Sequence, residues 1–328
     1  MCSRESDSHN TGANILLAKN RKSQMLNIID SVRLHQKKIE KVISPFIFNN
    51  IFNQNVRKTG HFRTWLYSPM NYARIMEIPL TMLLLDAKKE ELILDVSSPK
   101  LLALYYSLSG YTNVVAADLE NYFVNDFEIF KQEVGLNIET KVFDATKIIP
   151  YPENYFDKIF SISVLEHIPY NGDTEALKQI LRVLKPGGIA VITLPAFSNY
   201  VEEWISSKSF YWKSATNADG AVFYQRRYDL ESIHSRLEIN DGKIEKILFV
   251  AEKPIKEPGL NHEGRMLHNS YYIDHVIFSK YVKKLKRFKI PLSEYFAENY
   301  VSHKCHYITE DHSDLNIRQV VIKIKKDA

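Results

Sequence analysis

The chain has 328 residues and a mass of 38.2 kDa, and 45% of its residues are hydrophobic, 12% aromatic and 25% charged. This composition is typical of a globular protein, so disordered and fibrous classes are excluded. The formal charge of +4 is too small, and too evenly spread, to indicate a nucleic-acid binder.

The cysteines and the hydropathy pattern predict the compartment. Cys2 and Cys305 lie at opposite ends of the sequence and form no CxxC pair or metal-ligand cluster. The polar N-terminus lacks the apolar stretch of a signal peptide, and the longest apolar run, residues 78–85, is far shorter than a membrane span. We therefore expect a cytoplasmic protein without a membrane span.

Two helices are predicted before the first strand, one over residues 22–45 after a frayed polar start and one over residues 69–85. From residue 91 strands and helices alternate. The predicted strands are 92–96, 113–118, 138–143, 156–163 and 189–194, and the predicted helices are 100–108, 121–134 and 173–184. Ser98 and Pro99 are predicted to cap and begin the helix 100–108. Asp173 is predicted to cap the helix 173–184, and residues 185–188 (Lys-Pro-Gly-Gly) are predicted to end it.

The last third of the chain contains two further predicted strands, 243–251 and 317–324, separated by a long aromatic-rich insertion. Short connections between alternating strands and helices predict a doubly wound, mostly parallel α/β sheet. We divide the chain into an N-terminal helical extension or cap (1–90), a core (91–253), an insertion or lid with a possible role in acceptor binding (254–316), and a closing strand with its tail (317–328).

Acidic residues follow the predicted strands with unusual regularity. In a doubly wound sheet, ligands bind beyond the carboxyl ends of the strands, and here these ends carry Asp95, Asp118, Asp144 and Glu166. Asp118 lies 23 positions after Asp95, where a carboxylate can accept hydrogen bonds from both hydroxyls of a ribose. This arrangement indicates an adenosine-containing cofactor.

Five segments in order resemble the motifs of the class I S-adenosylmethionine-dependent methyltransferases, with a core like that of methyltransferase types 11 and 25. The resemblance covers residues 90–195. The segments are ILDV (93–96), VVAAD (114–118), FDA (143–145), FDKIFSISVLEHI (156–168) and LKPGGIAV (184–191).

The resemblance implies a Rossmann-like seven-stranded sheet and S-adenosylmethionine as cofactor. It places the methionine part against Asp95, Ser97, Ser98 and Pro99, the ribose against Asp118 and Leu119, the adenine against Asp144 and Ala145, and the sulfonium beside Ser163 and Val164.

The turn after the first strand departs from the family, because it reads Asp95-Val-Ser-Ser-Pro-Lys-Leu101 where relatives have a glycine-rich turn. Serine and proline do not give the backbone freedom of glycine. We interpret the turn as an altered loop; loss of catalysis is the alternative.

His167 and Glu166 are the candidate catalytic residues, with His167 as the base for a hydroxyl acceptor. The resemblance also implies that Tyr224, Arg226 and Arg227, which follow the fifth strand, are acceptor-binding residues, and an arginine there can hold a carboxylate or phosphate of the acceptor. The alternatives are a packing role for His167 and Glu166, and surface ion pairs of the arginines with Asp229 or Glu231.

Three further features carry less weight. The spacing of His303, Cys305, His306 and His312 matches no common ligand set, so we predict no metal. Residues 280–289 suit a lysine-rich amphipathic helix, with contact to an anionic surface as the alternative. Residues 210–212 (Phe-Tyr-Trp) suit either an acceptor pocket or lid packing.

The leading hypothesis is methyl transfer to a hydroxyl, or with less support an amine, of a small-molecule or glycan acceptor. An RNA or other nucleic-acid methyltransferase is the nearest alternative, and SVLE at 163–166 stands where enzymes that modify base amines have a proline-rich motif. A non-catalytic binding subunit is the third. A nicotinamide dehydrogenase is disfavoured because GxGxxG is missing after the first strand. The sequence does not indicate the oligomeric state.

Overall fold

The computed structural model describes residues 6–206, 215–253 and 290–328. The predictions for residues 210–212 and 280–289 lie outside these ranges. None of the helices in the described ranges is both long enough and apolar enough to cross a membrane.

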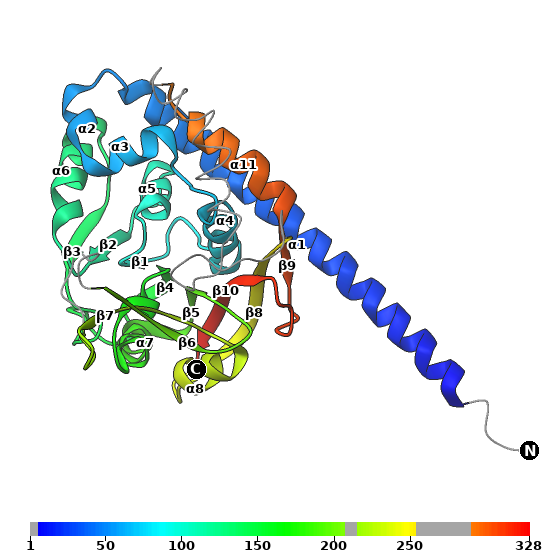
Figure 1. Cartoon of the computed structure of the whole chain (residues 1–328). Coiled ribbons are helices and arrows are strands. Elements are labelled where there is room, and N and C mark those ends of the chain that lie inside the picture. The colour runs from blue at the N-terminus through cyan, green and yellow to red at the C-terminus, as the bar shows by residue number, and fades with distance from the viewer. Residues whose placement is uncertain (1–5, 207–214, 254–289) are drawn as a thin grey trace, which may run out of the picture.

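An eight-stranded sheet with the order β3-β2-β1-β4-β5-β10-β8-β9 forms the centre of the molecule (Figure 1). Five neighbouring strands of this sheet run parallel to one another: β1 (Ile93–Val96), β2 (Val114–Asp118), β3 (Glu139–Val142), β4 (Phe156–Ile162) and β5 (Leu184–Pro195). The others join antiparallel to their neighbours: β8 (Gly242–Glu252), β9 (His306–Thr309) and β10 (Ile317–Lys326). The predicted fold class is confirmed, but the sheet has one strand more than predicted, because β9 extends its edge.

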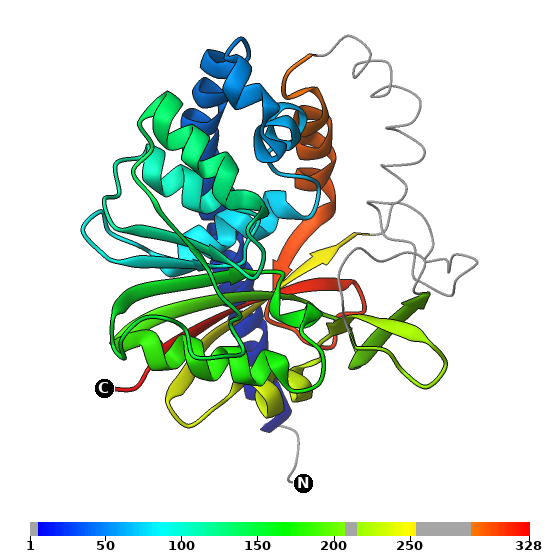
Figure 2. The ribbon, with the colours of Figure 1, turned by 90° about the vertical axis from the view of Figure 1, so that its left-hand side faces the viewer.

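Helices cover both faces of the sheet (Figure 2). One face packs against α4 (Arg74–Leu85), α5 (Leu101–Leu108) and α6 (Tyr122–Val134), and the other against α7 (Gly172–Val183) and α8 (Leu230–Leu237). Successive side chains of β1 point to opposite faces, so Ile93 and Leu94 belong to different core clusters. This two-faced burial explains the continuous apolar strands of the sequence.

The N-terminal segment forms α1 (Ser6–Asn50), α2 (Gln54–Lys58) and α3 (Gly60–Tyr67). Helix α1 is longer than predicted, and its first half extends away from the body of the molecule (Figure 1). Its second half contacts α11 (Ser293–Cys305), where Gln36 Nε2 donates to the Tyr295 hydroxyl and to Asn299 Oδ1, both at 2.8 Å. Chain segments from the two ends of the sequence thus share one core.

Three local predictions were wrong. The helix after β1 does not start at Ser98-Pro99 but at Leu101, because the Ser98 hydroxyl accepts a hydrogen bond from Ile162 N at 2.9 Å instead of capping the helix. Asp173 lies inside the first turn of α7, where it accepts from the Tyr228 hydroxyl. Residues 185–188 bulge within β5, which starts immediately after α7, and Gly187 takes a φ of 75° there.

A two-stranded hairpin lies outside the main sheet and was not predicted. It consists of β6 (Val201–Ser206) and β7 (Ala221–Arg227), which pair antiparallel. Because β7 contacts the short 3-10 helix η1 (Leu165–His167), the hairpin lies beside the carboxyl end of β4.

Gly172, the first residue of α7, provides a test of how closely Ile168 packs against the start of that helix. A Cβ atom at this position would lie 2.1 Å from Ile168 Cγ2 and 3.0 Å from Ile168 Cβ, so an alanine fits only if Ile168 or the backbone around it shifts. We expect Gly172→Ala to lower the free energy of unfolding by about 1–3 kcal/mol in urea titrations. Gly60→Ala, whose nearest neighbour would be at an ordinary 3.6 Å, is the control with little change. Equal stability of both variants would contradict the packing described.

Candidate functional site

The predicted carboxylates gather at the carboxyl edge of the parallel strands, where the strand order reverses beside β1. Asp95 lies in β1 and is fully buried, whereas Asp118 ends β2 and is 8% exposed. Asp144 follows β3, and Glu166 lies in η1 after β4. The structure therefore brings the acidic residues to one edge, as the strand pattern predicted.

A lysine that the sequence analysis did not single out lies between the first two carboxylates. Lys100 Nζ is 3.3 Å from Asp118 Oδ2 and 3.6 Å from Asp95 Oδ2. It also donates hydrogen bonds to Ser98 O at 2.8 Å and Ala117 O at 2.9 Å. The Lys100 side chain is fully buried, so this ammonium is an internal counter-ion of the site.

Asp95 has no solvent-exposed surface with which to contact a ligand directly. Its Oδ1 accepts from Ser98 N at 2.9 Å, whereas Oδ2 accepts no hydrogen bond from the described residues and faces Lys100. Burial raises the pKa of Asp95, and the charge of Lys100 opposes that shift.

Asp118 retains capacity to bind a ligand. Its contacts with Glu120 N at 3.3 Å and with the Tyr122 hydroxyl at 3.4 Å are long, and the Leu119 and Tyr122 side chains next to it are exposed. Burial and the charge of Asp118 raise the pKa of Tyr122, which keeps its hydroxyl protonated. A carboxylate beside exposed apolar and aromatic surface fits a ribose that carries a flat base.

Asp144 and Ala145 stand beside Asp118, because Phe143 N donates to Asp118 O at 2.9 Å. The Asp144 carboxylate accepts from Thr146 N at 2.8 Å and from Thr146 Oγ1 at 2.7 Å, so it shapes its own turn. Ala145 is largely buried.

Glu77 of α4 lies at the ends of β4 and β5, in the centre of the site. The sequence analysis did not single out this residue. This fully buried carboxylate accepts from Ser163 Oγ at 2.5 Å, from Arg74 Nη1 at 2.7 Å and, at a shorter distance, from Thr193 Oγ1. Its only sequence signal is a charged residue within an apolar helix. Ser163, with φ of 49°, and Val164 lead directly from β4 into η1.

His167 projects toward the hairpin. Its Nδ1 lies 2.6 Å from Tyr224 O, and because a carbonyl only accepts, Nδ1 carries the proton and Nε2 the lone pair. Burial lowers the pKa of His167, so the ring is neutral at pH 7. Glu166 Oε1 lies 3.7 Å from Nε2, and burial raises the pKa of Glu166 to about 8. The pair therefore combines a neutral imidazole with a protonated carboxyl.

The two candidate arginines have different partners from those considered. Arg226 is fully buried and donates to Ile168 O at 2.5 Å, to Tyr170 O, and to the Tyr200 hydroxyl at 3.1 Å. Arg227 pairs with Glu203 at 2.7 Å. Asp229 instead caps α8. Arg226 thus holds the chain after η1, and the expected ion pairs with Asp229 or Glu231 are not the ones formed.

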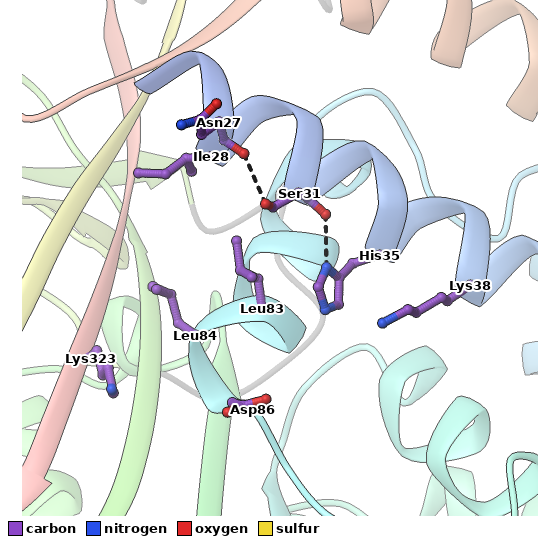
Figure 3. A pocket seen from close by; sticks show the side chains of 9 residues that line it. All are labelled: Asn27, Ile28, Ser31, His35, Lys38, Leu83, Leu84, Asp86 and Lys323. Carbon is purple, nitrogen blue, oxygen red and sulfur yellow. Dashed lines mark hydrogen bonds between the residues drawn. The ribbon is translucent and has the colours of Figure 1, made fainter. Parts of the chain in front are cut away.

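Two other features lie apart from this edge. A groove of about 640 Å³ between α1 and the far end of α4 is lined by Ser31, His35 and Leu83 among others (Figure 3), and it contains none of the predicted site residues. Over the described ranges, the structure has no group of three or more His, Cys, Asp or Glu side chains that could hold a metal ion.

Comparison with known proteins identifies the core. Residues 94–192 match the family described as "Methyltransferase domain". An uncharacterized protein of Methanocaldococcus jannaschii is 26% identical over 147 residues, covering 44% of this chain and 60% of that protein. The tRNA (carboxymethyluridine(34)-5-O)-methyltransferase of Arabidopsis thaliana is 34% identical over 87 residues, covering 22% of this chain and 21% of the plant protein.

The chain is also similar to a further curated enzyme and to a solved structure. A sterol 24-C-methyltransferase of Pneumocystis carinii is 34% identical over 79 residues, covering 24% of this chain and 20% of that enzyme. The solved structure of the [4+2]-cyclase SpnF has a TM-score of 0.45 and 16% identity, covering 91% of this chain and 97% of that one. The matches span less than two thirds of the length of each of the three curated relatives.

The family match identifies residues 94–192 as a methyltransferase domain. The resemblance seen in the sequence is thereby confirmed, and the cofactor of this domain is S-adenosylmethionine.

The protonated state of Glu166 has a measurable consequence. In the unfolded chain a glutamate ionises above about pH 4.5, whereas Glu166 in the folded protein stays protonated up to about pH 8, so between these values stability falls as pH rises. We expect Glu166→Gln to remove this loss, gaining at most about 1.4 kcal/mol per pH unit relative to the natural chain. Urea unfolding from pH 5 to 8 measures it, with exposed Glu231→Gln as control. A difference independent of pH would show that Glu166 is ionised in the folded protein.

Proposed function

We propose that the chain transfers a methyl group from S-adenosylmethionine to a hydroxyl of a small-molecule or sugar-containing acceptor, with an amine as the less favoured acceptor atom. The observation that carries this proposal is His167, whose ring is neutral and whose Nδ1 proton is committed to Tyr224 O. A hydroxyl must lose its proton as it is methylated, and a neutral imidazole is suited to take it. The bound cofactor supplies an electrophilic methyl group.

The cofactor-binding roles follow from position. Asp118 would accept the ribose hydroxyls with Leu119 beside it, and Asp144 with Ala145 would border the adenine. The main chain at Ser97, Ser98 and Pro99 would face the methionine part of the cofactor. Asp95 is buried and would not touch the cofactor, but it would hold this turn in place through its contacts with Ser98 N and Lys100. Ser163 and Val164 would border the reacting end.

The acceptor would enter between η1, the hairpin and the start of α4. His167 has 27% of its side chain exposed and Arg74 has 24%, so both are accessible to a ligand. The charge of Arg74 helps to lower the pKa of His167. Tyr224 and Arg227 line the hairpin side, while buried Arg226 would position η1 and the following loop. We assign Glu166 a positioning role, because its protonated carboxyl lies beside His167 Nε2.

A nucleic-acid acceptor is the second candidate, because the Arabidopsis thaliana relative is named as a tRNA methyltransferase that acts on oxygen. The weak, spread-out charge of the chain favours the small acceptor. We place the protein in the cytoplasm on the basis of its cysteine content.

Cofactor binding is the first test. Asp118→Ala removes the acceptor for two ribose hydrogen bonds, and we expect the affinity for S-adenosylhomocysteine to fall by roughly 30-fold or more in calorimetry. Asp118→Asn keeps the shape of the side chain and removes its charge, so it shows how much of the loss in affinity is due to the charge. Asp219→Ala, in the exposed turn before β7, is the control and should leave the affinity unchanged. Circular dichroism checks that each variant is folded. Absence of binding to the natural chain at millimolar ligand would overturn the active-enzyme proposal in favour of a non-catalytic subunit.

Catalysis is tested with His167→Gln. Methyl transfer from labelled S-adenosylmethionine is followed against a panel of hydroxyl, amine and RNA acceptors. With the acceptor so found, we expect the variant to lose roughly 100-fold or more in kcat, because general base catalysis is lost. Its affinity for S-adenosylhomocysteine should stay within about twofold. An active His167→Gln variant would refute the role of base.

A further inference from the structure

Lys100 occupies the position in the loop after β1 where relatives carry a glycine-rich turn. Ser97 and Lys100 both have left-handed backbone, with φ of 58° and 64°, although neither is glycine. Such backbone is unfavourable for residues with side chains and persists only where other contacts hold it. Here the contacts are those of the Lys100 ammonium with Ser98 O, Ala117 O, Asp95 and Asp118.

Asp95, Asp118 and Lys100 together carry a net charge of −1, because two carboxylates face one ammonium. Lys100 has no solvent-exposed side chain and two of its N–H groups are bound to carbonyl oxygens. The aromatic ring of Phe123, 5.0 Å from Nζ, adds to the shell around it. Nothing in this shell depends on a ligand, so the ammonium is a permanent part of the site.

The charge matters because the cofactor changes its own charge during the reaction. S-adenosylmethionine carries a sulfonium, an ammonium and a carboxylate, for a net charge of +1. When the methyl group moves to a hydroxyl oxygen, the sulfonium becomes the neutral thioether of S-adenosylhomocysteine and the hydroxyl proton is released. An ammonium 3.3 Å from the ribose-binding carboxylate therefore repels the substrate form more than the product form.

We propose that Lys100 sets the selectivity of the cofactor site, lowering its preference for S-adenosylmethionine over S-adenosylhomocysteine. This inference rests on the proposed function. A ribose held at Asp118 would bring the cofactor close to Nζ, and at a separation of about 10 Å a unit charge in a partly buried site changes affinity by roughly three- to tenfold. The product is accordingly bound more tightly, relative to the substrate form, than it would be without Lys100.

The test compares Asp95→Asn with the double variant Asp95→Asn/Lys100→Met by calorimetry with each ligand. The pair isolates the ammonium, because the two variants differ only at position 100, and in the double variant Asp118 keeps its contacts with Glu120 N and the Tyr122 hydroxyl. We expect the ratio of the two dissociation constants to favour S-adenosylmethionine roughly three- to tenfold more in the double variant than in Asp95→Asn.

A purely structural role of Lys100 would weaken both ligands equally and leave the ratio unchanged. Equal ratios in the two variants would therefore overturn the inference. Lys131→Met, which removes a lysine on the outer side of α6, is the control for loss of charge elsewhere and should not alter the ratio. Failure of the natural chain to bind either ligand would instead overturn the proposed function, so the two failures are distinguishable.

Discussion

The arrangement of the site depends on the burial of the Glu77 carboxylate. A charged group without solvent contact is tolerated only when its oxygens are bound, and Glu77 satisfies them through Ser163, Thr193 and Arg74, with Gln319 at 3.2 Å. These partners come from the ends of β4 and β5, from α4 itself and from β10. The carboxylate therefore fixes helix α4 across three strands and places Arg74 at the side of the site where the acceptor would bind.

Much of the fold could be predicted because its signals are local. The strands β1, β2 and β4 each lie within one residue of their predicted ends, since both faces of the sheet are buried and apolar runs mark such strands. The grouping of Asp95, Asp118 and Asp144 followed from the geometry of parallel strands.

The remaining features depend on contacts between distant residues. Glu77 reaches Thr193, and Lys100 reaches Asp118, across turns whose shape the local sequence does not specify. The β6–β7 hairpin and strand β9 gain their stability from partners far along the chain. For the same reason Ser98 was assigned to a helix cap, while in the structure its hydroxyl serves Ile162 on a neighbouring strand.

Arg226 holds the chain after η1 mainly through two carbonyl oxygens, those of Ile168 and Tyr170. Every residue type supplies the same carbonyl, so these two hydrogen bonds do not depend on the side chains at positions 168 and 170. Arg226 therefore sets the path of the loop, whereas exposed side chains such as Tyr170 set the surface that the loop presents.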